Sequence, residues 1–141
     1  MGDDHTALIC DFGLSHLKEG QRSTTISNAI QGTLNFMAPE RFDAAPVNYP
    51  ADVYSFAMTA WQIHTGLVPF PGISLDAFHL HVIEQQERPE YPNSMNKTLW
   101  TLIQDCWQPD PTRRPTFSGI EASLQPISEP CTQFSTTFSS T

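Results

Sequence analysis

Apolar residues are most concentrated between residues 51 and 65, in the stretch ADVYSFAMTAWQIHT. Large apolar side chains would fall on nearly every face of a helix there, and a helix that is apolar all round is a buried one. Pro50 suits the first turn of such a helix, and Gly66 suits the residue after its last turn. The pattern predicts a buried central helix over 51–65, with the large apolar residues Val53, Tyr54, Phe56, Met58, Trp61 and Ile63.

Three further segments carry a helical period of apolar residues. The first is 74–86, for which Ser74 is a suitable cap. The second is 97–107, which the prolines of QPDPTRRP prevent from continuing. The third runs from about 116 to 124. The residues predicted to face inward are Phe78, Val82 and Ile83 in the first, Leu99, Leu102, Ile103 and Cys106 in the second, and Phe117, Ile120 and Leu124 in the third.

The two ends of the chain and the segment 14–35 carry no helical period. Residues 6–10, TALIC, read as a short buried strand. Residues 14–35 are rich in Gly, Ser, Thr and Asn and predict a long loop, which in a compact domain is usually functional or disordered. The tail, residues 126–141, is rich in Ser and Thr and is expected to be disordered. The expected fold is mainly α: one short strand, a long loop, then about four helices around a buried central helix.

The acidic balance of the chain argues against one class of partner. The 141 residues carry a formal net charge of −8, and the sequence pI is about 4.8. Binding to the phosphate backbone of a nucleic acid needs a basic face, so no nucleic-acid partner is expected. No apolar run approaches the roughly 18 residues that indicate a membrane span, so no transmembrane segment is expected.

The cysteines indicate neither a zinc site nor a redox site. Cys10, Cys106 and Cys131 contain no close pair and no Cys-x-x-Cys motif. Reduced thiols in an intracellular protein are the simplest account, and we expect a cytoplasmic location. Gly2 and Thr6 fit the Met-Gly-x-x-x-Ser/Thr pattern of N-myristoylation, with two acids in the spacer; this short match leaves the modification open.

A set of motifs in fixed order carries the chemical information. Asp11-Phe12-Gly13 follows the predicted strand, and on its own it would be typical of an ordinary turn. The loop, GTLNFMAPE at 32–40, DVYSF on the central helix and CWQPDPTRRPTF before the last helix then follow. Asp-Phe-Gly and Ala-Pro-Glu on either side of a phosphorylatable loop belong to the signature set of protein kinases. From about residue 5 to 125, the sequence resembles the C-terminal half of a protein kinase domain.

This resemblance implies a domain organisation and a subgroup. Residues 1–125 would be a partial kinase domain, the truncated large lobe with its activation loop, and 126–141 its tail. Thr33 is what serine/threonine kinases have at that place, whereas DVYSF and CWQPDPTRRPTF look like the tyrosine-kinase branch. The combination resembles the tyrosine-kinase-like group of serine/threonine kinases, which transfer phosphate from ATP to proteins with Mg²⁺ as cofactor.

The resemblance also implies roles for single residues near the phosphates and the substrate. Asp11 would hold Mg²⁺, a hard cation that prefers oxygen ligands. Phe12 would pack in or out to set active and inactive forms. Gly13 would let the backbone pivot, because it has no Cβ. Thr33 would contact the catalytic Asp and shape the substrate site. Asp11, Phe12 and Gly13 form the expected site for ATP and Mg²⁺, and Thr33 is the expected contact at the substrate site.

Three further residues have implied structural roles. Glu40 would pair with Arg114, whose planar guanidinium can hold a carboxylate through two parallel bonds; the alternative is two solvated surface charges. Asp52 would cap the free backbone N–H groups of the central helix. In the family it holds the catalytic loop.

The loop hydroxyls are candidate phosphorylation sites. A phosphate there could pair with an Arg and order the loop, or the hydroxyls could simply be solvated. The candidates are Ser23, Thr24, Thr25 and Ser27.

Several parts of a complete kinase are missing from these 141 residues. They contain no Gly-rich loop, no Val-Ala-Ile-Lys-type lysine and no His-Arg-Asp catalytic loop. The sequence therefore predicts a part of a serine/threonine kinase that is inactive alone. The alternative is a non-catalytic module that docks protein partners, or associates with itself, through the uncovered apolar face of helix 51–65.

Overall fold

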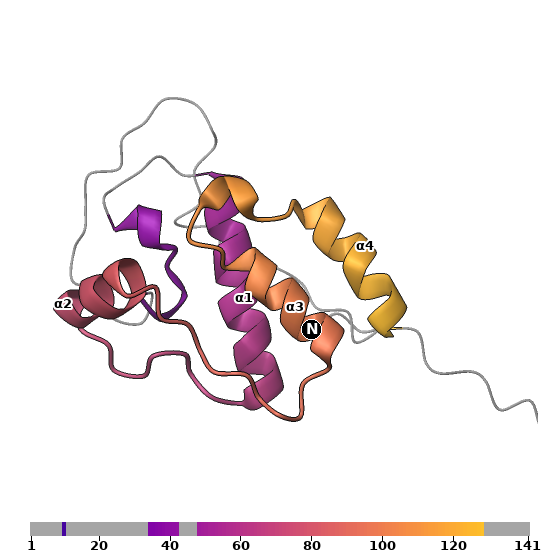
Figure 1. The fold of residues 1–141 in the computed structure, drawn as a ribbon, viewed down its shortest axis with the longest axis horizontal. Helices are drawn as coiled ribbons and strands as arrows, with labels where there is room; N and C mark the ends of the chain where they lie inside the picture. The colour runs from indigo at the N-terminus through magenta and orange to yellow at the C-terminus, as the bar shows by residue number, and fades with distance from the viewer. Residues whose placement is uncertain (1–9, 11–33, 43–47, 129–141) are drawn as a thin grey trace, which may run out of the picture.

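The computed structural model describes residue 10 and residues 34–42 and 48–128 of the chain. The predicted strand 6–10, apart from Cys10, and most of the predicted loop 14–35 therefore lie outside the described residues, as does the tail beyond residue 128. Within the described part, the predicted fold class is confirmed, because the chain there is mainly helical. Figure 1 shows helix α1 in the middle, with α2 on one side and α3 and α4 on the other.

Helix α1 spans Tyr49–Thr65 and begins two residues earlier than the sequence predicts. The reason is Asn48, whose side-chain oxygen accepts a hydrogen bond from the backbone N–H of Ala51 at 3.1 Å. Asp52 is therefore not the cap that we predicted; it lies exposed in the first turn. The helix ends as predicted at Gly66, whose φ of 71° is the left-handed conformation that glycine adopts without strain.

The expectation that α1 is buried on all sides is wrong. Val53, Tyr54, Ala57 and Met58 are at most 1% exposed, but Ile63 is 80% exposed. The other described helices cover only part of the α1 surface, so the side chains that face away from them meet solvent. Helix α1 is thus the centre of the core and also carries an open face.

Helices α3, Lys97–Cys106, and α4, Phe117–Ser128, complete the first core cluster. The backbone N–H groups of Thr98 and Leu99 donate to the side chain of Asn96, which caps α3. Helix α4 ends four residues later than predicted. Of its predicted inward residues, Phe117 is 45% exposed and meets Phe56 only edge-on at a ring separation of 6.1 Å.

The predicted helix 74–86 is shorter and changes type along its length. Helix α2 is a single turn, Leu75–Ala77, capped by the predicted Ser74, and it continues as the π-helix η4, Phe78–Glu84. The wider π turn is seen where the N–H of Gln85 donates to the carbonyl of Leu80, five residues back. Apolar spacing cannot separate an α from a π helix over so few residues.

A second, smaller core cluster joins this unit to the rest of the protein. Its buried residues are Leu34, Phe78 and Val82, each 1% exposed. In the described residues, the first cluster contains no side chain from α2 or η4. The α2–η4 unit, residues 75–84, therefore belongs to the second core, on the far side of α1 from α4 (Figure 1).

Candidate functional site: the Glu40–Arg114 junction

Residues 34–42 contain two short 3-10 helices, and the first of them includes the last two residues of the predicted loop 14–35. The helices are η2, Leu34–Phe36, and η3, Pro39–Arg41. The side-chain nitrogen of Asn35 donates to the carbonyls of Pro69 and Phe70, at 2.6 and 2.7 Å. The hydroxyl of Ser55 in α1 donates to the carbonyl of Phe36 at 2.9 Å. Segment 34–42 is therefore attached to α1 and to the turn that follows it.

Glu40 and Arg114 form a two-pronged ion pair at the end of this segment. The two terminal guanidinium nitrogens donate to Oε1 and Oε2 of Glu40, at 2.7 and 2.9 Å. The side chain of Arg114 is 0% exposed and that of Glu40 is 17% exposed. Both charges are largely removed from water, so each depends on the other. The contact implied by the kinase resemblance is present, and the alternative of two solvated charges is not what the structure shows.

Further bonds from Arg114 engage two more N–H groups of its guanidinium. Its Nε donates to the carbonyl of Gln108 at 2.9 Å, and one terminal nitrogen also donates to the carbonyl of Pro50 at 2.8 Å. The pair therefore joins η3, the first turn of α1 and the segment before α4. Such a buried charge is tolerated because its hydrogen-bonding capacity is used.

Two arginines lie over the ring of Tyr54 at this junction. The guanidinium carbons of Arg88 and Arg114 each lie 5.2 Å from the centre of its ring. A cation over an aromatic face is attracted by the ring quadrupole. Burial raises the pKa of the Tyr54 hydroxyl to about 12, although the two nearby positive charges act in the opposite direction. Tyr54 therefore stays neutral at physiological pH and serves as a packing surface for both cations.

Arg88 is a structural residue that the sequence did not reveal. Its Nε donates to the carbonyl of Trp107 at 3.1 Å, and a terminal nitrogen donates to the carbonyl of Val82 at 3.1 Å. These carbonyls belong to the C-terminal ends of α3 and η4, where a positive charge is favourable. Burial lowers the pKa of Arg88 below its ordinary value. Its only sequence signal is a position in a Pro-containing loop, which does not distinguish it from other arginines.

The predicted catalytic and regulatory residues lie outside the described residues. These are Asp11, Phe12, Gly13, Ser23, Thr24, Thr25, Ser27 and Thr33. Among the described residues there is no cluster of three His, Cys, Asp or Glu side chains that could hold a metal ion. The roles of these residues toward ATP, Mg²⁺ and substrate thus stay predictions, while the structure describes segment 34–42 and its attachment to α1.

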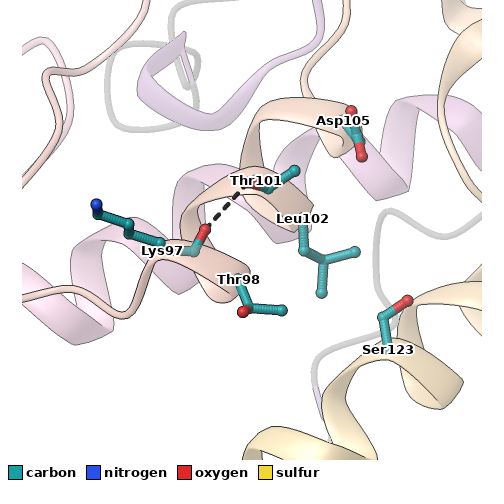
Figure 2. A pocket seen from close by; sticks show the side chains of 6 residues that line it. All are labelled: Lys97, Thr98, Thr101, Leu102, Asp105 and Ser123. Atoms are coloured by element: carbon teal, nitrogen blue, oxygen red, sulfur yellow. Dashed lines mark hydrogen bonds between the residues drawn. The ribbon is translucent and has the colours of Figure 1, made fainter.

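Two shallow cavities, each of about 360 Å³, lie elsewhere on the described surface. One lies between α3 and α4, and Figure 2 shows its lining of Lys97, Thr98, Thr101, Leu102, Asp105 and Ser123. There the Thr101 hydroxyl donates to the Lys97 carbonyl at 3.0 Å, so the proton of this hydroxyl already has an acceptor within its own helix. The other cavity is mainly apolar and lies where Phe56 of α1 meets α4. Neither cavity includes Glu40, Arg114 or any residue of segment 34–42.

Helix length and composition also bear on membranes. In the part of the chain that the structure covers, no helix combines the length and the apolar character that crossing a bilayer requires.

Comparison with known proteins gives the same family throughout. The family model for protein tyrosine and serine/threonine kinases matches residues 1–124. The dual specificity protein kinase shkA of Dictyostelium discoideum is 40% identical over 128 residues, which are 89% of this chain and 24% of that protein. The serine/threonine/tyrosine-protein kinase HT1 of Arabidopsis thaliana is 36% identical over 129 residues, 92% of this chain and 32% of that protein.

A third relative has a name that specifies serine/threonine kinases alone. The serine/threonine-protein kinase STY17 of Arabidopsis thaliana is 32% identical over 126 residues, which are 89% of this chain and 22% of that protein. The chain thus spans about a fifth to a third of the length of these three curated relatives.

Proposed function

The chain belongs to the protein tyrosine and serine/threonine kinase family, as a C-terminal part of a kinase domain of the tyrosine-kinase-like type, and on that premise we propose its function. It is the activation segment and helical base of an enzyme that transfers phosphate from ATP to serine or threonine residues of proteins. The observation that carries this proposal is the buried pair of Glu40 and Arg114. It fixes the far end of an activation segment whose near end is Asp11-Phe12-Gly13.

The proposed division of labour places the chemistry before the anchor. With ATP bound, Mg²⁺ would neutralise charge on the phosphates, and Asp11 is the residue of this chain that would hold it. Thr33, which directly precedes η2, would contact the protein substrate. Glu40, Arg114 and Tyr54 would act only through position, since they keep segment 34–42 against α1.

We further propose that these 141 residues do not catalyse phosphoryl transfer by themselves. Positioning of the γ-phosphate uses a Gly-rich loop and a lysine, and a catalytic Asp accepts the proton of the substrate hydroxyl. None of these motifs occurs in the sequence. We place the active protein in the cytoplasm, where ATP and reduced thiols are available.

Two measurements test this proposal together. Calorimetry of the 141-residue chain with ATP and Mg²⁺ should detect no tight nucleotide binding; tight binding would contradict the proposed inactivity of the chain alone. The transcript that encodes the chain should continue upstream into a segment with a His-Arg-Asp motif. Stop codons in every upstream frame would exclude a longer kinase.

The role of Asp11 is tested in that longer protein. Asp11→Asn should abolish phosphorylation of a generic serine/threonine substrate such as myelin basic protein. Asp110→Asn is an equal change at an exposed acid that caps η5; asparagine is an equally good cap, so activity should stay within about twofold. Equal activity of the Asp11→Asn variant and the wild type would exclude the metal-binding role.

A second candidate function is supported by the open face of α1. Ile63 is 80% and Leu67 62% exposed at the end of this helix, and exposed apolar residues that gather on a surface mark interaction sites. In this alternative the chain would be a non-catalytic module that associates with itself or with a protein partner. Light scattering over a range of protein concentrations tests this alternative. The Ile63→Lys substitution should abolish any self-association of the chain. A wild type that is monomeric at every concentration would count against self-association.

A further inference from the structure

The turn between α1 and α2 holds a phenylalanine in an unusual conformation. Phe70 has a φ of 46°, a region that residues with a large side chain rarely adopt. Its side chain packs against both core clusters, and its carbonyl accepts hydrogen bonds from Asn35 at 2.7 Å and from the N–H of Ile73 at 3.2 Å. Such strain persists only where the surroundings hold it.

Asn35, which belongs to segment 34–42 and not to this turn, holds the turn through side-chain hydrogen bonds. Its side chain is buried, with the residue 7% exposed, and its amide nitrogen donates to two successive carbonyls, those of Pro69 and Phe70. Pro69 is itself fully buried. A side-chain amide has two N–H donors, and both are used here. Replacing this group would remove the Asn35 hydrogen bond from the Pro69 carbonyl and leave the Phe70 carbonyl with the Ile73 N–H alone.

The attachment of the α2–η4 unit passes through the same place. Its buried residues Phe78 and Val82 pack with Leu34 of η2, the neighbour of Asn35, and not with the first core cluster. On the segment side, the rings of Phe42 and Phe78 stack at 6.0 Å. At its other end the unit is attached through Arg88, which bonds the carbonyls of Val82 and Trp107.

From these contacts we propose that Asn35 is a latch: its amide fastens the turn 66–73, and with it the α2–η4 unit, to segment 34–42. Opening the latch releases the strain at Phe70 and separates Phe78 and Val82 from Leu34, while Arg88 keeps the end of η4 attached to α3. The α2–η4 unit thereby responds as one piece to the position of the segment that follows Thr33. This coupling concerns the internal packing of the chain and does not depend on phosphoryl transfer.

Hydrogen exchange of backbone amides in the 141-residue chain tests the latch. Asn35→Asp presents acceptors to the two carbonyls, and Asn35→Leu removes the donors without adding charge. In both variants, exchange at Ile73 and Phe78 should accelerate at least roughly tenfold, as in a local opening. The amides of Trp100 and Trp107, which donate within and at the end of α3, should change less than about twofold.

A matched substitution separates the latch from the general effect of an added charge. Asn96 caps α3 as an acceptor for the N–H groups of Thr98 and Leu99, and a carboxylate is also an acceptor, so Asn96→Asp should leave every rate within about twofold. Uniform acceleration at all four probe amides would show that Asn35 is merely structural and would overturn the proposal. Acceleration in Asn35→Asp but not in Asn35→Leu would also overturn it, because the hydrogen bonds would then carry no coupling.

Discussion

Arg114 holds Glu40 through both terminal nitrogens of its guanidinium, across 74 residues of sequence. The contact joins η3 to the segment that precedes α4. Because the arginine side chain is 0% exposed, removal of either partner leaves a buried charge without compensation. This relationship determines the first prediction.

Glu40→Gln should lower the free energy of unfolding by about 3–5 kcal/mol, as expected when one partner of a buried ion pair is lost. The amide can still accept one hydrogen bond but offers Arg114 no charge. Urea titration followed by tryptophan fluorescence measures the change. Arg113→Gln, at the exposed neighbouring position, serves as control and should stay within about 0.5 kcal/mol. Equal effects of the two variants would show that the Glu40 pair contributes no special stability.

Alkaline pH should destabilise the protein through Tyr54. Burial raises the pKa of this hydroxyl from 10.0 to about 12 in the folded chain, so the stability it contributes is complete below pH 10 and is lost as the pH rises toward 12. Two pKa units correspond to about 3 kcal/mol. Unfolding free energies measured from pH 9 to 12 should fall in the wild type.

Two tyrosine substitutions test whether Tyr54 causes this pH dependence: Tyr54→Phe is the test and Tyr91→Phe is the control. Tyr54→Phe should show a smaller fall in stability, and Cys106, whose pKa burial also raises to about 12, accounts for part of the remainder. Tyr91→Phe, which loses a different phenol and its hydrogen bond to the carbonyl of Met95, is the control for the loss of a phenol as such. The same slope in wild type and Tyr54→Phe would contradict the assignment.

Helix α1 should respond very differently to substitutions on its two faces. Met58 is 0% exposed, and Met58→Ala should cost about 2–5 kcal/mol through lost burial and the cavity left behind. Ile63→Ala removes an apolar side chain that is 80% exposed and should cost less than about 0.5 kcal/mol. Thermal or urea unfolding provides the measurement. A large effect of Ile63→Ala would mean that the open face is covered.

The thiol of Cys106 should be almost unreactive in the folded protein. Only the thiolate is nucleophilic, and burial raises the pKa of Cys106 from 9.0 to about 12; three pKa units reduce the thiolate fraction about a thousandfold at neutral pH. Labelling with N-ethylmaleimide, read by peptide mass spectrometry, should modify Cys10, which is exposed, long before Cys106. Urea should make the labelling rates of Cys10 and Cys106 comparable. If the two rates are already comparable without denaturant, Cys106 is not protected by burial in the folded protein.

The sequence predicted the helices wherever apolar periodicity was strong. The α3 segment was predicted to within a residue at its end, because Leu102, Ile103 and Cys106 form one buried stripe and prolines follow directly. The prediction from apolar spacing failed where an α-helix and a π-helix share the same pattern. Segment 74–86 has the apolar spacing of an α-helix but forms a π-helix over Phe78–Glu84. Boundaries also depended on caps, since Asn48 and not Asp52 begins α1.

Of the candidate site, the sequence predicted the pairing of Glu40 with Arg114, but only through resemblance to a family; two charges so far apart carry no local signal of their contact. Asp11, Phe12, Gly13, Thr33 and the loop hydroxyls lie outside the described residues and stay predictions. Arg88 and the side-chain amide of Asn35 were missed because their partners are backbone carbonyls. Any sequence supplies such carbonyls, and only folding brings particular ones together.

The sequence by itself determined the family, the mainly helical class and the central position of residues 51–65, because motif order and apolar spacing are local properties of the chain. Only the tertiary structure decided that two arginines lie over the ring of Tyr54, that α1 keeps an open face, and that the α2–η4 unit packs against segment 34–42. These features depend on which distant surfaces meet, and that is set by packing of the whole chain.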